Sequence, residues 1–200
     1  MATKYGFSNI REQLVHSLKG AYPTKWEEYQ AAGILGEDIF GSPKPHPNAV
    51  LNLFLQQNVR FAIPLAAYRA TVGGFSSLIS EEPGSMLPRL TLASTVYGME
   101  AMHGGVAELA KSMVINMMEG ECLDKKCASE QGAGELNGFC DVVVRGLRGS
   151  GIFSSLPLGN IVCADCAKIA GQVHISWCAA VWENLPRIFM VGKSWEEILV

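Results

Sequence analysis

The stretch IVCADCAKIAGQVHISWCAAVWENLPRIF, residues 161–189, decides the fold of this 200-residue chain. Its apolar positions recur at steps of three and four residues, which is the period of an amphipathic α-helix. The spacing predicts a helix over about residues 164–185 and places His174, Cys178 and Trp182 on its apolar face. At its start stands a Cys-x-x-Cys pair, Cys163 and Cys166, which brings two thiols to one helix end.

Helical spacing also covers much of the chain before this stretch. It predicts helices over residues 3–19, 24–32, 49–58 and 106–118, with Asn48 as an N-cap and Pro64 in a first helical turn. The proline-rich residues 41–48 and the polar residues 120–138 are predicted as loops, and residues 142–144 fit a strand or a helix equally well. Residues 194–199 form a terminal turn with Ser194 as its cap. No βαβ rhythm or internal repeat appears, so we expect a mainly α protein, a compact multi-helix bundle.

Composition narrows the class of protein. Apolar residues make up 48 % of the chain and charged residues 18 %, which is typical of a globular protein. The net charge of -3 gives no general attraction to nucleic acid or to an anionic membrane. We find neither the apolar core of a signal peptide nor an uncharged run of about 18 apolar residues, so we expect a cytoplasmic or nuclear protein without a membrane span.

Four of the six cysteines form two pairs that suggest a metal site. In a reducing compartment cysteines serve as metal ligands or free thiols more often than as disulfides. A structural zinc ion takes four such ligands in a tetrahedron, and helix N-terminal N–H groups favour thiolates. We therefore predict a four-cysteine zinc clasp that joins the loop 120–138 to the start of the last long helix, with the ligands Cys122, Cys127, Cys163 and Cys166.

The alternatives for these cysteines stay open. A thioredoxin-like redox pair follows a buried strand in a βαβ unit, which is missing here, and four unrelated free thiols are the remaining interpretation. Cys140 and Cys178 are interpreted as buried small hydrophobic residues, and His174 as a hydrogen-bonded core histidine. Each of these three residues is nevertheless a candidate to replace one ligand.

Sequence motifs of catalysis are missing from the chain. It contains no Gly-x-Ser-x-Gly, phosphate-binding loop, His-Glu-x-x-His or dinucleotide fingerprint. A zinc ion held by four thiolates leaves no open position for water, so such a site stabilises the fold and does not catalyse. We expect a protein that is not an enzyme, and a reactive cysteine at Cys140 or Cys163 is the enzymatic alternative.

The C-terminal sequence resembles a known family. Residues 162–199 resemble the C-terminal part of BTB/POZ-domain proteins of mushroom-forming, basidiomycete-type fungi, in which a Cys-x-x-Cys pair starts a helix that leads to Trp, Leu-Pro, an apolar pair and a final Trp turn. The upstream pair Cys122 and Cys127 matches as well, as do the segments ATKYGFSNIREQLVHSLKGAYP and FAIPLAAYRAT. The matching residues of the C-terminal part are Cys163, Cys166, Trp182, Leu185, Pro186, Ile188, Phe189, Trp195 and Leu199.

The resemblance implies an organisation and a role. Residues 1–40 correspond to a helix pair at the end of a BTB domain, and residues 47–200 to a post-BTB helical region with a cysteine-rich part, residues 120–200. It implies an adaptor-type module that binds protein partners around a structural zinc. The strand-and-helix BTB core that dimerises such proteins has no counterpart in this sequence, so the oligomeric state stays open. The alternative is a zinc-dependent nucleic-acid-binding protein related to transcription. The net negative charge of the chain argues against it.

Overall fold

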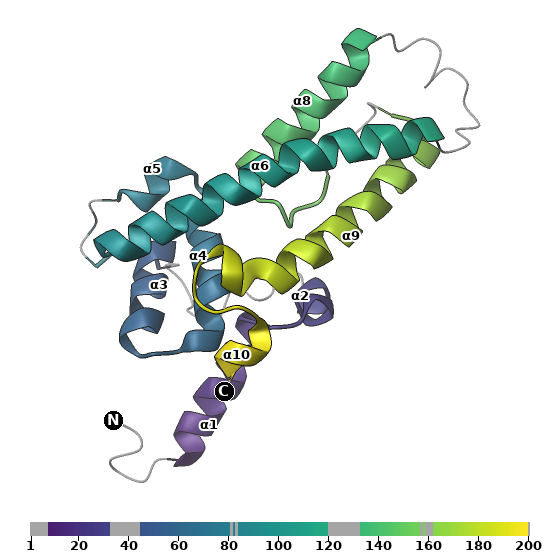
Figure 1. Ribbon diagram of the computed structural model, residues 1–200. Helices are drawn as coiled ribbons and strands as arrows, with labels where there is room; N and C mark the ends of the chain where they lie inside the picture. Colours follow the sequence, from purple (N-terminus) through teal and green to yellow (C-terminus); the bar gives the residue numbers. More distant parts are fainter. Residues whose placement is uncertain are drawn as a thin grey trace.

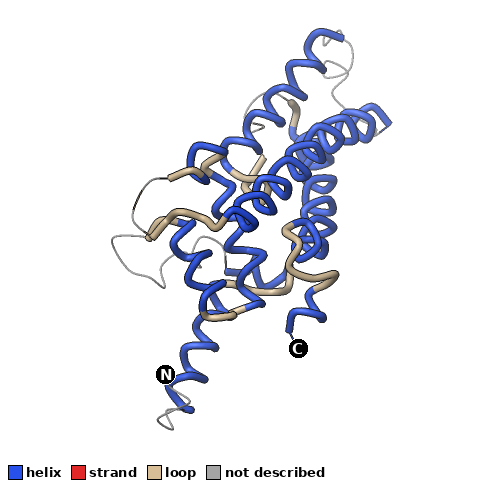
Figure 2. Tube along the Cα trace, turned by 60° about the vertical axis from the view of Figure 1, so that its left-hand side comes forward, coloured by secondary structure: helices blue, strands red, loops and turns tan. Residues whose placement is uncertain are grey.

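The computed structural model describes residues 8–32, 45–80, 82, 84–119, 133–156, 158 and 162–199, and the regular elements among them are all helical (Figure 1, Figure 2). The prediction of a mainly α protein is therefore confirmed for this part of the chain. In chain order the elements are α1 (Ser8–Ala21), α2 (Trp26–Ala32), α3 (Pro47–Gln56), the 3-10 helix η3 (Arg60–Ala62), α4 (Ile63–Val72), α5 (Phe75–Leu78), α6 (Arg89–Glu119), α8 (Ala133–Ser150), α9 (Ala164–Ile188) and α10 (Trp195–Leu199).

The longest helix, α6, forms the spine of the molecule, and α9 runs beside it (Figure 1). Two glycines of α6 allow the close approach, because a Cβ placed on Gly98 would lie 2.5 Å from the ring of Phe189, and one on Gly105 would lie 3.1 Å from the ring of Trp177. Gly98 faces Phe189 and the later Gly105 faces the earlier Trp177, so α6 and α9 are antiparallel. This register brings the end of α6 at Glu119 to the first turn of α9 (Figure 1).

Helix α8 packs against α6, and its buried side chains explain why it is a helix. Phe139, Val143 and Leu147 are buried at steps of four residues, which places them on one helical face. The open choice between strand and helix at residues 142–144 is thereby decided in favour of helix. Residues 133–138 also belong to α8, so the predicted loop over 120–138 is wrong at its C-terminal end. The rest of that segment, residues 120–132, lies outside the described residues.

Asn48 is not the N-cap of α3, contrary to the prediction. His46 holds that position, and its Nδ1 accepts the N–H of Asn48 at 3.2 Å. The side chain of Asn48 is buried, and its Nδ2 donates to the carbonyl oxygens of Ser77 at 2.9 Å and Leu78 at 3.2 Å. The amide therefore fastens the end of α5 to the start of α3, a long-range role that sequence spacing does not reveal.

Two prolines have opposite effects on their helices. Pro64 lies in the first turn of α4, as predicted, where its missing N–H costs nothing. Pro186 lies inside α9 and removes the N–H that the carbonyl oxygen of Trp182 would accept in a regular helix. The indole Nε1 of Trp195 donates to that oxygen instead, at 2.9 Å. Trp182 in turn donates from its own Nε1 to the carbonyl oxygen of Thr24 at 3.0 Å, so α10, α9 and the segment before α2 are linked.

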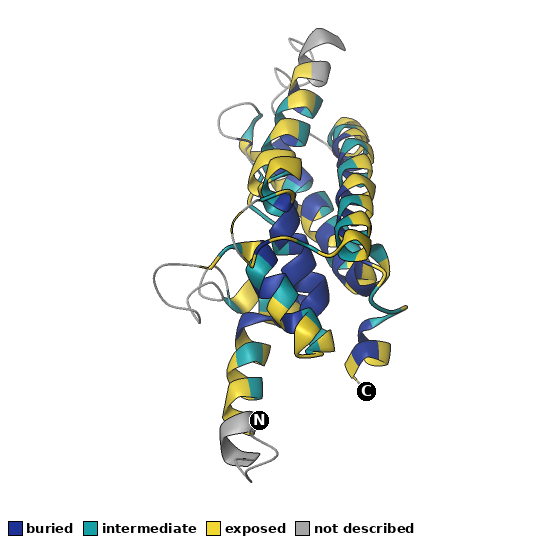
Figure 3. Ribbon diagram, turned by 90° about the vertical axis from the view of Figure 1, so that its left-hand side faces the viewer, coloured by how far each residue is buried: buried dark blue, intermediate teal, exposed yellow. Residues whose placement is uncertain are grey.

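Helix α1 extends away from the rest of the molecule, and its described side chains are mostly exposed (Figure 3). Leu14 on this helix is 58 % exposed. Among the described residues, no helix has both the length and the hydropathy to cross a membrane. The division of the chain into residues 1–40 and 47–200 stays a prediction.

Candidate metal site and its surroundings

Cys163 and Cys166 lie together at the N-terminal end of α9, as the spacing predicts. Cys163 is the N-cap, with extended backbone angles, and its Sγ accepts the N–H of Cys166 at 3.5 Å. Cys166 is buried in the first turn, and Cys163 is half-buried. The N–H groups of a helix N-terminus favour negative charge, so both sulfurs are in a place that suits thiolate ligands.

The other predicted ligands, Cys122 and Cys127, lie outside the described residues. Within the described ranges, no group of three or more His, Cys, Asp or Glu side chains is arranged to hold a metal ion. The described part of the chain therefore contributes two sulfurs of the predicted clasp, and the clasp itself stays a prediction.

The candidate replacement ligands do not join this pair. His174 and Cys178 lie eight and twelve residues beyond Cys166 on the same helix, which is roughly 12 Å and 18 Å along its axis. Zinc ligands lie within about 2.0–2.3 Å of the ion, so neither residue can share an ion with Cys166. Cys140 lies on α8 and forms no metal-holding group with the described cysteines.

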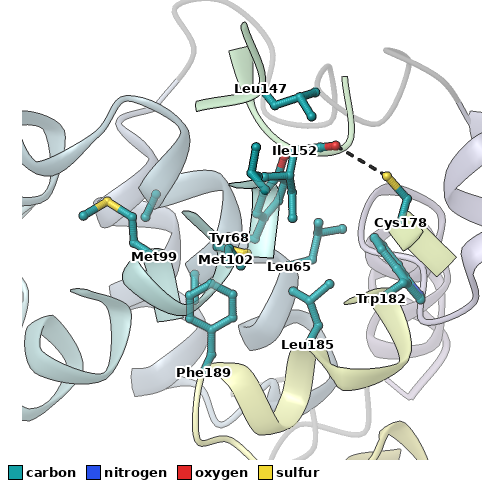
Figure 4. Packing of buried hydrophobic residues seen from close by; sticks show 14 of the residues in the cluster. Leu65, Tyr68, Met99, Met102, Leu147, Ile152, Cys178, Trp182, Leu185 and Phe189 are labelled. Atoms are coloured by element: carbon teal, nitrogen blue, oxygen red, sulfur yellow. Dashed lines mark hydrogen bonds between the residues drawn. The ribbon is translucent and has the colours of Figure 1, made fainter. Parts of the chain in front are cut away.

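His174 and Cys178 instead form a buried polar cluster with the carbonyl oxygen of Ile152. The His174 Nε2 lies 2.9 Å from this oxygen and 3.2 Å from the Cys178 Sγ. The Cys178 thiol donates to the same oxygen at 3.4 Å, as the dashed line in Figure 4 shows. Both side chains are buried, and they lie one helical turn apart on the face that the sequence predicted. The interpretation of His174 as a hydrogen-bonded core histidine agrees with this geometry.

The cluster does not have the arrangement of a catalytic Cys–His pair. A carbonyl oxygen has no proton to donate, so the 2.9 Å contact between the His174 Nε2 and the Ile152 oxygen requires a proton on Nε2. With that proton directed to Ile152, Nε2 cannot remove the proton of the Cys178 thiol. Burial raises the pKa of Cys178 to about 12 and lowers the pKa of His174, the latter against a smaller opposing effect of the Ile152 hydrogen bond. Both side chains are therefore neutral near neutral pH, and thiolate chemistry is disfavoured.

Cys140 also lacks the surroundings of an activated thiol. It is half-buried on α8, and burial, followed by the neighbouring Asp141, raises its pKa, while Lys111 on α6 has a smaller opposite effect. A nucleophilic cysteine needs a lowered pKa near neutral pH. The charges around Cys140 act mainly in the other direction.

Sequence reasoning missed the cavity that lies over the His174 and Cys178 cluster. It has a volume of about 660 Å³ and is walled by four aromatic rings, those of Trp26, Tyr29, Tyr68 and Phe153. These rings come from α2, α4 and the segment after α8, so no local pattern connects them. The only hint in the sequence is the pair of aromatic residues at a three-residue step in the WEEY motif, residues 26–29.

The described geometry places two cysteine sulfurs at one helix end and a neutral polar cluster deeper in the fold. Comparison of the chain with models of protein families, with curated proteins and with solved structures finds no match. The function of the chain is therefore inferred from its own residues.

Proposed function

We propose that this chain is a non-enzymatic protein–protein interaction module of the adaptor type, stabilised by one structural zinc ion. The resemblance of residues 162–199 to the C-terminal part of fungal BTB/POZ proteins supports this role. The zinc ligands that we propose are Cys122, Cys127, Cys163 and Cys166.

The single observation that carries the interaction role is an exposed apolar stripe on α6. Leu90, Ala93, Tyr97 and Ala101 are all exposed and follow one another at steps of three and four residues, so they share one helical face. Leu90 is 86 % exposed and Tyr97 is 60 % exposed. Contiguous apolar surface on a protein marks an interaction site more often than isolated exposed residues do, and Tyr is enriched at interfaces.

A paired charge substitution tests the stripe. Leu90→Glu with Tyr97→Glu places two carboxylates on it, and both side chains are exposed, so the fold should be retained. We expect the cross-linked partners of the wild-type chain, identified by mass spectrometry in cells, to disappear with this variant. The matched control is Ile115→Glu with Met118→Glu, at exposed positions near the other end of α6, which should keep them. Partners that survive the first variant, or that vanish equally with both, contradict the proposed surface.

The register of α6 and α9 supports the zinc clasp. It brings Glu119, the last residue of α6, to the first turn of α9, which carries Cys166, with Cys163 as its cap. Cys122 follows Glu119 by three residues, and three residues span at most about 10 Å. The upstream pair therefore starts within reach of the downstream pair.

Metal analysis of protein purified without chelator tests the clasp separately from the stripe. We expect one zinc per chain in the wild type and none in Cys163→Ser. Because the binding energy of a structural zinc, about 10 kcal/mol or more in small domains, is also folding energy, this variant should lose several kcal/mol of stability. Cys178→Ser is the control and should keep the zinc at a cost of about 1–3 kcal/mol. Equal zinc content and equal melting of the two variants would show that the ligands are wrongly assigned.

A further inference from the structure

The aromatic-walled cavity between α2, α4, α9 and residues 150–155 has the size of a small-molecule site. Its volume is about 660 Å³, and sites for drug-sized ligands occupy about 300–1,000 Å³. The buried residues Tyr68, His174 and Cys178 form its deep part, whereas the exposed Gln30 and Ser155 lie at its rim. The cavity therefore has aromatic walls, a neutral polar cluster at its base and an accessible polar edge.

The aromatic walls are held in place by contacts with one another. The ring centroids of Tyr68 and Phe153 lie 4.7 Å apart, and those of Trp26 and Phe153 lie 5.5 Å apart. The backbone N–H of Phe153 also donates to the Tyr68 hydroxyl at 3.2 Å, which fixes the segment after α8 against α4. Rings fixed in this way present flat surfaces against which another aromatic ring can stack at little cost in conformational entropy.

The charge at the cavity determines whether it favours an anionic or a cationic ligand. Among the described residues that line it, Arg69 carries the only full charge, because no carboxylate contributes and His174 is neutral. The Arg69 guanidinium is fixed by a hydrogen bond from Nη2 to the carbonyl oxygen of Ala21 at 3.2 Å and by its position 4.6 Å from the ring centroid of Tyr22. Arginine has five N–H donors, so this hydrogen bond leaves others for an anion. A cation, which an aromatic pocket would otherwise suit, is repelled here.

We propose that this cavity binds a planar aromatic anion, with its rings against Trp26 and Phe153 and its carboxylate or sulfonate directed to Arg69. This site goes beyond the interaction role, since it lies between α2, α4 and α9 and not on the exposed stripe of α6.

Two matched fluorescent probes test the proposal. Anilinonaphthalene sulfonate is an anion that carries a flat naphthalene ring and a phenyl ring, and phenylnaphthylamine has the same rings without the sulfonate. We expect saturable binding of the sulfonate by the native chain at one site. Arg69→Gln should weaken sulfonate binding about tenfold, the effect of one partly solvated charge pair, and leave phenylnaphthylamine within about twofold. Arg69→Lys keeps the charge and should retain most of the sulfonate affinity.

A second variant keeps the test valid if substitutions at Arg69 disturb the fold. Ser155→Trp puts an indole at the exposed rim and should abolish binding of both probes, whereas Ser76→Trp adds the same group at an exposed position on α5 and should change neither. Circular dichroism of each variant verifies the fold. No saturable binding by the wild type, an equal loss of both probes in a folded Arg69→Gln variant, or unchanged binding by Ser155→Trp would each overturn the proposal.

Discussion

Replacing Trp195 by phenylalanine is expected to destabilise the protein more when Pro186 is present than when it is absent. In the native chain the Trp195 Nε1 donates to the Trp182 carbonyl oxygen at 2.9 Å, which Pro186 deprives of its helical donor. Both tryptophans are buried, so water cannot easily replace the lost donor. A buried acceptor left without a partner costs about 1–3 kcal/mol.

The double-mutant cycle isolates this hydrogen bond from the change in ring size. Pro186→Ala returns a backbone N–H at position 186, which can donate to the Trp182 oxygen along the helix. Trp195→Phe should then lose packing alone, and the two substitutions should couple by about 1–2 kcal/mol. For a chain of this length, each kcal/mol shifts the melting temperature by about 2–4 °C, which thermal unfolding followed by far-ultraviolet circular dichroism resolves.

A half-buried tryptophan on the same helix provides the control. Trp177→Phe changes a ring of the same kind that packs on Gly105, away from the Pro186 break, so its cost should be the same in both backgrounds. If Trp195→Phe costs equally much with and without Pro186, the indole does not replace the missing helical donor and the reasoning is refuted.

Three further predictions concern packing and titration. Gly98→Ala should cost about 1 kcal/mol of stability, because overpacking against the buried ring of Phe189 outweighs the gain in helix propensity. Gly104→Ala has open space around it and should gain about 1 kcal/mol. Melting temperatures that shift in the same direction in both variants contradict the close contact at Gly98. Burial lowers the pKa of His174, so the stability that its neutral ring provides is complete above the ordinary pKa of about 6.5 and is lost as the pH falls below it. His174→Gln should therefore flatten the dependence of melting temperature on pH in the acidic range. A residual slope should remain from His103, whose pKa burial also lowers. An unchanged profile would exclude a contribution of His174 protonation to stability. Burial raises the pKa of Cys178 to about 12, so iodoacetamide at about pH 8 should label it only after denaturation, and mass spectrometry that finds rapid labelling of the native chain contradicts its burial.

Sequence spacing predicted a helix where the apolar period is unbroken. In α9 the apolar period continues to Trp182 without interruption, and the observed helix extends only a few residues beyond the predicted end. Ser194 caps α10 as predicted, accepting the N–H of Glu197 at 3.4 Å. The first half of α6 was missed because Gly98, Gly104 and Gly105 weaken the local preference for helix, and the packing of α9 on that surface compensates.

For the candidate sites, too, the positions of residues within one helix could be predicted, and contacts between separate segments could not. Local spacing was sufficient to place Cys163 and Cys166 at one helix end and His174 with Cys178 on one face. It could not supply the Ile152 carbonyl that the latter pair shares, because that group comes from a separate segment brought close only by the tertiary fold. For the same reason no pattern in the sequence assembles the aromatic cavity.

The hydrogen bond from Trp182 to Thr24 has a consequence for synthesis of the chain. It joins residues 158 positions apart, so α2 leaves the ribosome long before the helix that covers Trp26 has been made. Until then Trp26 and Tyr29 lack the rings of Phe153 and Trp182 that pack on them in the native protein, and water or a chaperone takes that place. Contacts between such distant positions also slow folding, so α2 should become resistant to protease only after α9 has been made.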